Sequence, residues 1–260
     1  FRPLPGHHRG DRARGRRLPR HGRIAAVDLR ATPLPGLPQA LARVHAGLAV
    51  GARVSLRLAV EAGDVAPLLE GAGFEALPRA STVAAIRLRT LPDVVAPGMR
   101  LLVCGLNPSL YSADAGVNFA RPGNRFWPAA LAAGIVSVPR DPWHALVHHG
   151  VGFTDLVKRP TVAAGELGAG EYRHGVARLA WAVTLLKPAT VVFVGLTGYR
   201  AAIDRTATAG PQPGGFAGAA AYLMPNTSGL NAHARPADFA RHLAAAAGPP
   251  TATPLTDRRG

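Results

Sequence analysis

Three strand-length apolar runs, separated by segments of helical pattern, constrain the fold of this chain more than any other feature. The runs are MRLLVC (99–104), TVVFV (190–194) and AYLM with its preceding alanine (220–224). Short apolar runs without polar alternation are typical of strands buried on both faces. Helical spacing is found at 124–133, 170–186, 197–204 and 236–247. Strands that alternate with helices predict an α/β fold, here a three-layer α/β/α sandwich with a mostly parallel central sheet.

The rest of the chain divides around the Pro- and Gly-containing stretch LPDVVAPG at 91–98. Residues 24–94 have a smaller, partial α/β pattern, with strands expected at 24–28, 54–59 and 81–89 and helices at 37–48 and 65–73. We expect the run at 24–28 to be a buried strand. Residues 95–248 carry the sandwich, and residues 249–260 are expected to form a flexible tail.

Charge and cysteine content limit the classes of function. The net charge is +15, and residues 1–23 hold eight arginines and one aspartate, a net of +7 in an arm without apolar periodicity. This arm should be disordered and favours a polyanionic partner, nucleic acid first. The single Cys104 excludes a disulfide framework, a four-cysteine zinc site and an iron–sulfur cluster. Because no run of about 18 apolar residues exists, we expect a cytoplasmic protein without a membrane span.

Ligands of parallel α/β sheets bind beyond the carboxyl ends of the strands, so the loops after the runs are candidate sites. The first is GLNPSLYS (105–112), where Pro108 restricts the backbone and the Asn107 amide can orient a water molecule. The alternative is a local Asx turn without chemistry. In the second, MPNTSGLNAHAR (224–235), the apolar Leu230 lies among polar residues. It is either core or a wedge that fills the gap left by an extruded base.

Two other groups have open interpretations. Phe119 is a stacking platform or core, and Arg121 and Arg125 are phosphate contacts or solvated surface charges. His144 and His148 have the spacing of helical metal ligands, but with no third ligand apparent we expect a surface pair and no metal.

These stretches together resemble the mismatch-specific uracil/thymine-DNA glycosylases, a branch of the uracil-DNA glycosylase superfamily. The resemblance runs from about residue 95 to 243 and rests on APGMRLLVCGLNPSL, NFARPGNRFW, GVGFTDLVKRPT, KPATVVFVG and MPNTSGLNAHAR, in that order. It implies a monofunctional glycosylase of base excision repair that hydrolyses the N-glycosidic bond of a flipped uracil in G·U or G·T mismatched duplex DNA. Thymine and exocyclic cytosine adducts are further candidate substrates.

The resemblance also implies roles for individual residues. Asn107 positions the hydrolytic water, Phe119 stacks on the flipped base and Leu230 is the wedge. The base pocket is expected to comprise Leu106, Pro108, Ser109, Ser112, Phe119 and Asn226, and the DNA-binding loop Ser228, Gly229, Leu230, Asn231 and Arg235, with His233 near DNA. Ser109 stands where the family often has Gly, and Thr227 replaces a Pro. We expect a monomer that needs no cofactor and binds double-stranded DNA with a mismatched or damaged base.

Residues 24–90 resemble the C-terminal half of a class I methyltransferase, through DLRATPLP and LLEGAGFE. No Gly-rich strand-to-helix turn precedes them, and that turn lets the backbone of a nucleotide-binding fold approach its ligand. A non-catalytic structural appendage is therefore expected. The alternatives to a glycosylase are an S-adenosylmethionine-dependent methyltransferase remnant and a non-catalytic DNA-binding module.

Overall fold

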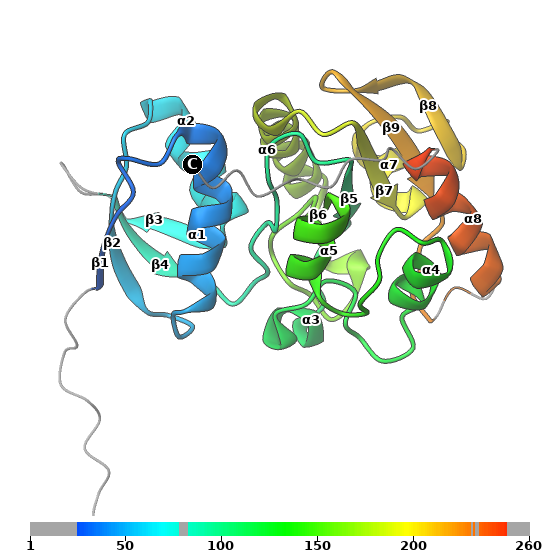
Figure 1. Cartoon of the computed structure of the whole chain (residues 1–260), viewed down its shortest axis with the longest axis horizontal. Coiled ribbons are helices and arrows are strands. Elements are labelled where there is room, and N and C mark those ends of the chain that lie inside the picture. Colours follow the sequence, from blue (N-terminus) through cyan, green and yellow to red (C-terminus); the bar gives the residue numbers. More distant parts are fainter. Residues whose placement is uncertain (1–24, 78–82, 230, 232–233, 249–260) are drawn as a thin grey trace, which may run out of the picture.

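A computed structural model describes residues 25–77, 83–229, 231 and 234–248. The basic arm, the tail, Leu230 and His233 lie outside the described residues. Two β-sheets form two bodies that lie side by side, a small one near the N-terminus and a large one after residue 91 (Figure 1).

The large sheet has five strands in the order β6-β5-β7-β9-β8. The four parallel strands are β5 (Leu101–Gly105), β6 (Val151–Asp155), β7 (Thr190–Val194) and β9 (Ala219–Met224), and β8 (Gly210–Phe216) is an antiparallel edge strand. The predicted mostly parallel sheet is confirmed. The strands β6 and β8 were not predicted, because VGFTD and GPQPGGF contain glycines and prolines that break the apolar pattern.

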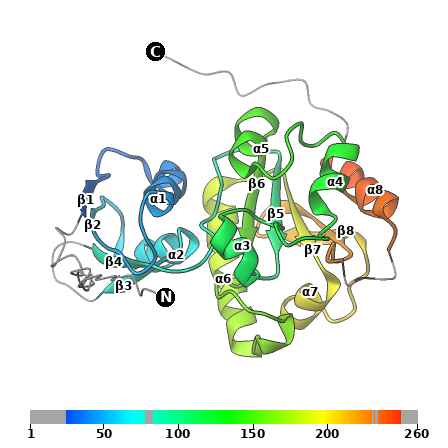
Figure 2. The same cartoon turned by 90° about the horizontal axis from the view of Figure 1, so that it is seen from below.

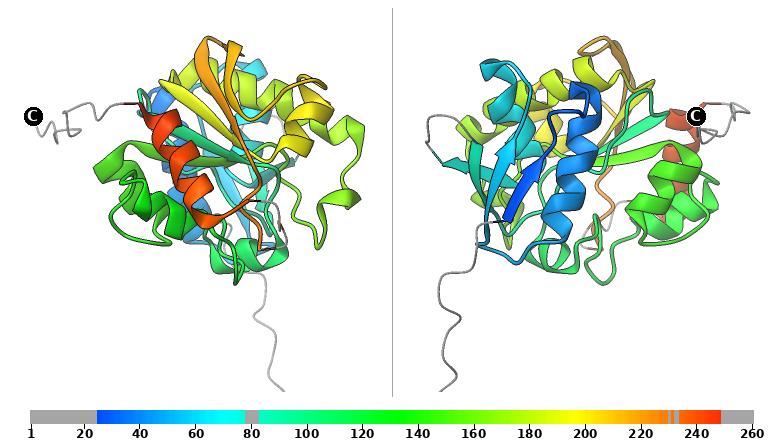
Figure 3. Two further views of the ribbon diagram at one scale, coloured as in Figure 1. Left: turned by 90° about the vertical axis from the view of Figure 1, so that its right-hand side faces the viewer. Right: turned by 60° about the vertical axis from the view of Figure 1, so that its left-hand side comes forward.

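Helices cover both faces of this sheet. Alternate strand residues point to opposite sides: Leu101, Val103 and Val192 join one core, whereas Leu102, Cys104 and Val191 join the other. The first core includes α4 (Phe126–Ala132) and α8 (Pro236–Ala247), and the second includes α6 (Ala169–Leu186) and α7 (Leu196–Ala202). Figures 2 and 3 show this layered arrangement, which confirms the predicted α/β fold. The remaining elements are α3 (Leu110–Ala115), α5 (Pro142–His149) and the 3-10 turn η2 (Ala164–Glu166).

Helix boundaries follow from capping. Helix α8 has its predicted bounds, and Asp238 Oδ2 accepts a hydrogen bond from Arg235 N at 2.8 Å in the first turn. Helix α4 begins two residues after Asn124, whose Oδ1 accepts a hydrogen bond from Phe126 N at 2.9 Å. Asn124 thus binds the start of the helix from just outside it.

The small sheet is mixed and has the order β1-β2-β4-β3. Its elements are β1 (Ala25–Asp28), η1 (Leu34–Gly36), α1 (Leu37–Ala46), β2 (Arg53–Arg57), α2 (Ala62–Gly71), β3 (Phe74–Leu77) and β4 (Val83–Arg87). A strand is present within the predicted range 24–28, but the prediction that it is buried is wrong. Ala25, Ala26 and Asp28 are exposed, because β1 lies at the edge of the described sheet and pairs only with β2 there.

The two bodies are packed together. In Figure 2, α1 and α2 lie between the small sheet and the large body. The Trp181 side chain of α6 contributes to the core of each body and donates a hydrogen bond from Nε1 to Asp64 Oδ1 at 2.8 Å. The connecting segment is also buried: Val94 and Val95 are core residues, and Val94 pairs with Phe153 of β6.

Candidate active site

A cavity of about 260 Å³ opens where the parallel strands of the large sheet end. It is lined by residues at the ends of four strands and by residues of the neighbouring loops and helices: Leu91, Gly105, Leu106, Asn107, Pro108, Ser109, Ser112, Phe119, Arg121, Asn124, Asp155, Thr161, Val162, Val194, Gly195, Thr197, Gly198, Asn226 and Ser228. The six residues expected to form the base pocket, and Asn107 itself, all line this cavity. Gly229, Asn231 and Arg235 do not line it, and Leu230 is outside the described residues.

Asn107 is fixed by contacts distant in the sequence. Its Nδ2 donates to Thr161 Oγ1 at 2.8 Å and to the Arg159 carbonyl at 3.0 Å, with a longer contact to the Pro108 carbonyl at 3.3 Å. The strongest partners are more than fifty residues away, which disfavours the alternative of a purely local Asx turn. Because the amide hydrogens are committed to protein acceptors, Asn107 has the acceptor Oδ1 to offer a ligand.

Ser109 and Ser112 shape the first loop. Ser109 is the N-cap of α3, and its Oγ accepts a hydrogen bond from Ser112 N at 3.1 Å. Ser112 is buried, and its Oγ accepts from Ala120 N at 3.2 Å. Ser109 therefore starts a helix, and Ser112 connects this helix to the Phe119 segment.

Phe119 has the geometry of a platform. Its backbone is left-handed, with φ of 56°, a conformation that is uncommon for a bulky side chain. One ring face stacks on Phe126, with ring centroids 4.3 Å apart and an interplanar angle of 20°. The residue is half-buried and lines the cavity. Gly105 makes room here, because a Cβ on it would collide with the Asp155 carboxylate and lie 3.5 Å from Phe119 Cζ.

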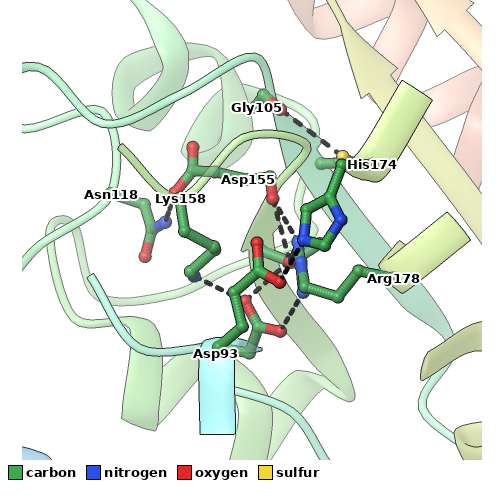
Figure 4. Close-up of polar contacts among 10 residues, drawn as sticks. Asp93, Gly105, Asn118, Asp155, Lys158, His174 and Arg178 are labelled. Carbon is green, nitrogen blue, oxygen red and sulfur yellow. Dashed lines mark hydrogen bonds and ion pairs between the residues drawn. The ribbon is translucent and has the colours of Figure 1, made fainter. Parts of the chain in front are cut away.

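Asp155 is a buried carboxylate in this cavity that the sequence reasoning did not select. Figure 4 shows its side chain. It is the last residue of β6 and is 4% exposed. Burial, together with the negative charge of Asp93, raises its pKa to about 6, and the positive charges of Lys158 and Arg178 oppose this shift. Its position at the carboxyl end of a strand was the available signal, but the strand had not been predicted.

Arg125 holds the second loop in place. Its guanidinium donates to the carbonyls of Ser228 (2.8 Å), Asn231 (2.6 Å) and Ala234 (2.8 Å), and it lies over the Phe239 ring at 4.8 Å. The interpretation of Arg125 as a solvated surface charge is therefore wrong, whereas its role as a phosphate contact stays a prediction. Arg121, in contrast, is exposed and lines the cavity.

The rest of the second loop packs closely against the segment that precedes α4. Thr227 is fully buried and donates from Oγ1 to Asn124 Oδ1 at 3.0 Å. Asn226 is exposed, and its Oδ1 accepts a hydrogen bond from Ser228 N at 2.9 Å. A Cβ on Gly229 would lie 2.8 Å from the Gly123 carbonyl oxygen, so only glycine fits. Arg235 is exposed at the start of α8.

Neither a membrane-spanning helix nor a group of metal-ligating side chains is found among the residues that the structure describes. No helix among them has the length and apolar character that a membrane span requires. No three of their histidine, cysteine, aspartate or glutamate side chains are grouped so that they would hold a metal ion. The His144 and His148 rings lie 4.3 Å apart as a pair on α5.

The fold and site together define an α/β protein with a polar and aromatic cavity at the carboxyl edge of its parallel sheet. A family model for the uracil DNA glycosylase superfamily matches residues 92–247, more than half of the chain. The chain therefore belongs to the uracil DNA glycosylase superfamily, whose members are hydrolases that act as DNA glycosylases in DNA repair. The matched region begins within the buried connecting segment, just before Asp93.

Proposed function

We propose that this protein is a monofunctional DNA glycosylase that hydrolyses the N-glycosidic bond of a flipped uracil in G·U or G·T mismatched duplex DNA. Thymine and exocyclic cytosine adducts are further candidate substrates. The observation that carries the proposal is that Asn107, Phe119 and Asn226, from three separate motifs, line one cavity. We also propose that the protein acts as a monomer.

In the proposed reaction, the base stacks on the free face of Phe119 and Asn107 Oδ1 orients a water molecule toward C1′. The electron pair of the C1′–N1 bond leaves with the base, and the water oxygen bonds to C1′. Backbone N–H groups of the pocket stabilise the negative charge that develops on the base. The ionised Asp155 stabilises the positive charge on the sugar and accepts a proton from the water.

Base release from a duplex with a single G·U pair, detected by alkaline cleavage of the abasic site, tests this function. We expect release by the wild-type protein and a rate at least about 100-fold lower for Asn107→Ala in single-turnover experiments, because the water is no longer oriented. Gln212→Ala on the distant edge strand β8 is the control and should keep the wild-type rate.

Each other outcome has a definite meaning. An unchanged rate in Asn107→Ala removes Asn107 from the mechanism. Wild-type protein that binds the duplex without releasing base supports the non-catalytic DNA-binding module. Strand cleavage without alkali contradicts a monofunctional enzyme.

We further propose that Leu230 fills the space left by the flipped nucleotide. The proposal is supported by the described residues on either side of it in the sequence, because Arg125 binds the carbonyls of Ser228 and Asn231, and Ser228 lines the cavity. For Leu230→Ala we expect weaker binding to abasic product and less flipping, measured by the fluorescence of 2-aminopurine next to the mismatch. Wild-type values in both measurements would refute the wedge.

We propose that residues 24–94 are a methyltransferase-like appendage without catalysis of its own, and that residues 95–248 form the catalytic domain. The close packing of α2 on α6 supports a structural role for the appendage. Titration calorimetry with S-adenosylmethionine should give no binding heat, whereas saturable binding would favour the methyltransferase alternative.

A further inference from the structure

A buried cluster of charged side chains lies next to Asp155, which lines the cavity (Figure 4). The Asp93 carboxylate accepts hydrogen bonds from Lys158 Nζ at 2.7 Å, Thr154 Oγ1 at 2.7 Å and Arg178 Nη1 at 2.8 Å. The side chains of Asp93, Lys158 and Arg178 are 7%, 5% and 1% exposed. Removing charges from water is costly, so a cluster this deeply buried depends on its internal pairing.

The cluster is bonded to the segment that forms one wall of the cavity. Arg178 Nη2 donates to the Asp155 carbonyl, and Thr90 Oγ1 donates to the Lys158 carbonyl. The next residues, Arg159 and Thr161, supply the acceptors for the Asn107 amide. The cluster thus fixes the backbone that carries Asp155 and holds Asn107.

The N-terminal body covers the cluster from the other side. Gly71, the last residue of α2, accepts a hydrogen bond from Asp93 N at 2.8 Å. A Cβ on Gly71 would lie 2.7 Å from Asp93 Oδ2 and 3.4 Å from Arg178 Nη1. Helix α2 therefore closes over the Asp93–Arg178 pair at a distance that only glycine permits.

The charges of the cluster also act on Asp155. Lys158 and Arg178 carry two positive charges, and Asp93 carries one negative charge. The net charge of these four side chains is therefore zero when Asp155 is ionised as well. The charged groups that act on Asp155 are Lys158 from the following loop, Arg178 from α6 and Asp93 from the connecting segment, while Cys104 of β5 stays a neutral thiol because burial raises its pKa.

We propose that Asp93 is a positioning residue of the active site, which acts through Lys158 and Arg178 to set the charge state of Asp155 and to hold the segment that binds Asn107. The N-terminal body thereby contributes to the site, because it shields this cluster from solvent. The proposal rests on the proposed function in one respect: the reaction uses the ionised Asp155.

The test compares the pH dependence of single-turnover base release in Asp93→Asn and Lys158→Met. Asp93→Asn leaves both cations uncompensated, so the apparent pKa of the acidic limb should fall by about one unit or more. Lys158→Met removes a positive charge near Asp155 and should therefore raise this apparent pKa. Glu70→Gln is the control, because Glu70 pairs with His174 at the same α2–α6 interface but on its exposed side. A role in folding alone would lower the rate at every pH without these opposite shifts.

A measurement that does not depend on catalysis separates this proposal from the proposed function. The ¹³C carboxyl resonance of Asp155, assigned by its loss in Asp155→Asn, reports the same titration by NMR. In one outcome, the pKa of Asp155 shifts in opposite directions in the two variants while the wild-type protein releases no base. That result would support the coupling between the cluster and Asp155 and would refute the proposed glycosylase activity. A folded Asp93→Asn variant in which Asp155 titrates as in the wild type overturns the coupling. If that variant does not fold, an unshifted titration in Lys158→Met overturns it.

Discussion

Asp155 gives the active site a titratable group in the neutral range. In Asp155 the pKa is raised to about 6, so the carboxylate form becomes dominant as the pH rises through this value. If the ionised form stabilises the sugar cation, base release accelerates between about pH 5 and 7 and then levels off.

The variant Asp155→Asn tests this assignment at the residue scale. It keeps the shape of the side chain but carries no charge, so we expect a loss of at least about 100-fold at pH 8 and no remaining acidic limb. The measurement is the single-turnover rate on a G·U duplex between pH 5 and 9. If the pH–rate profile of the variant kept the acidic limb of the wild type, the titrating group would be a residue other than Asp155.

At the scale of elements, the second loop depends on one arginine that reaches it from the start of α4. Three carbonyls converge on the Arg125 guanidinium, a planar group with five donors that one lysine ammonium cannot replace geometrically. The loop therefore owes its shape to Arg125, and the positions of Ser228 and Asn231 follow from it.

We expect Arg125→Lys to weaken binding of abasic duplex by about tenfold or more, because hydrogen bonds to a charged group each contribute about 1.5–3 kcal/mol. Fluorescence anisotropy with labelled duplex measures the Kd. Arg241→Lys on α8 is the control, since Arg241 is exposed and pairs only with Asp238 among the described residues. Equal affinities for both variants would show that the loop does not need this anchor.

At the scale of the whole molecule, Trp181 joins the two bodies. It is half-buried, contributes to the core of both and donates a hydrogen bond to Asp64. Trp181→Ala should lower the free energy of unfolding by about 2–4 kcal/mol and separate the melting of the small body from that of the large one. Differential scanning calorimetry checks this, with Tyr111→Ala, an aromatic residue 48% exposed on α3, as the control. A single transition at the wild-type Tm would contradict the coupling.

Local pattern predicted the core of the fold. The parallel strands β5, β7 and β9 were visible because strands covered by helices on both faces need apolar side chains at nearly every position. The bounds of α8 were visible because Pro236 and Asp238 favour a helix start. The edge strands β1 and β8 are not covered by helices on both faces in this way. The burial of β1 was therefore overestimated, and β8 was not predicted.

The sequence by itself determined the fold class and the set of motif residues that line the cavity, because strand periodicity and short loop motifs are local properties. Only the tertiary structure decided that Asp155 lines the same cavity, that Arg125 serves the second loop and that Asp93 lies between Lys158 and Arg178. The contacts of Arg125 with Ala234 and of Asp93 with Lys158 and Arg178 join residues between 65 and 109 positions apart along the chain. Their physical cause is burial, which raises the pKa of one carboxyl and compels distant charges to pair, and burial exists only once the chain has folded.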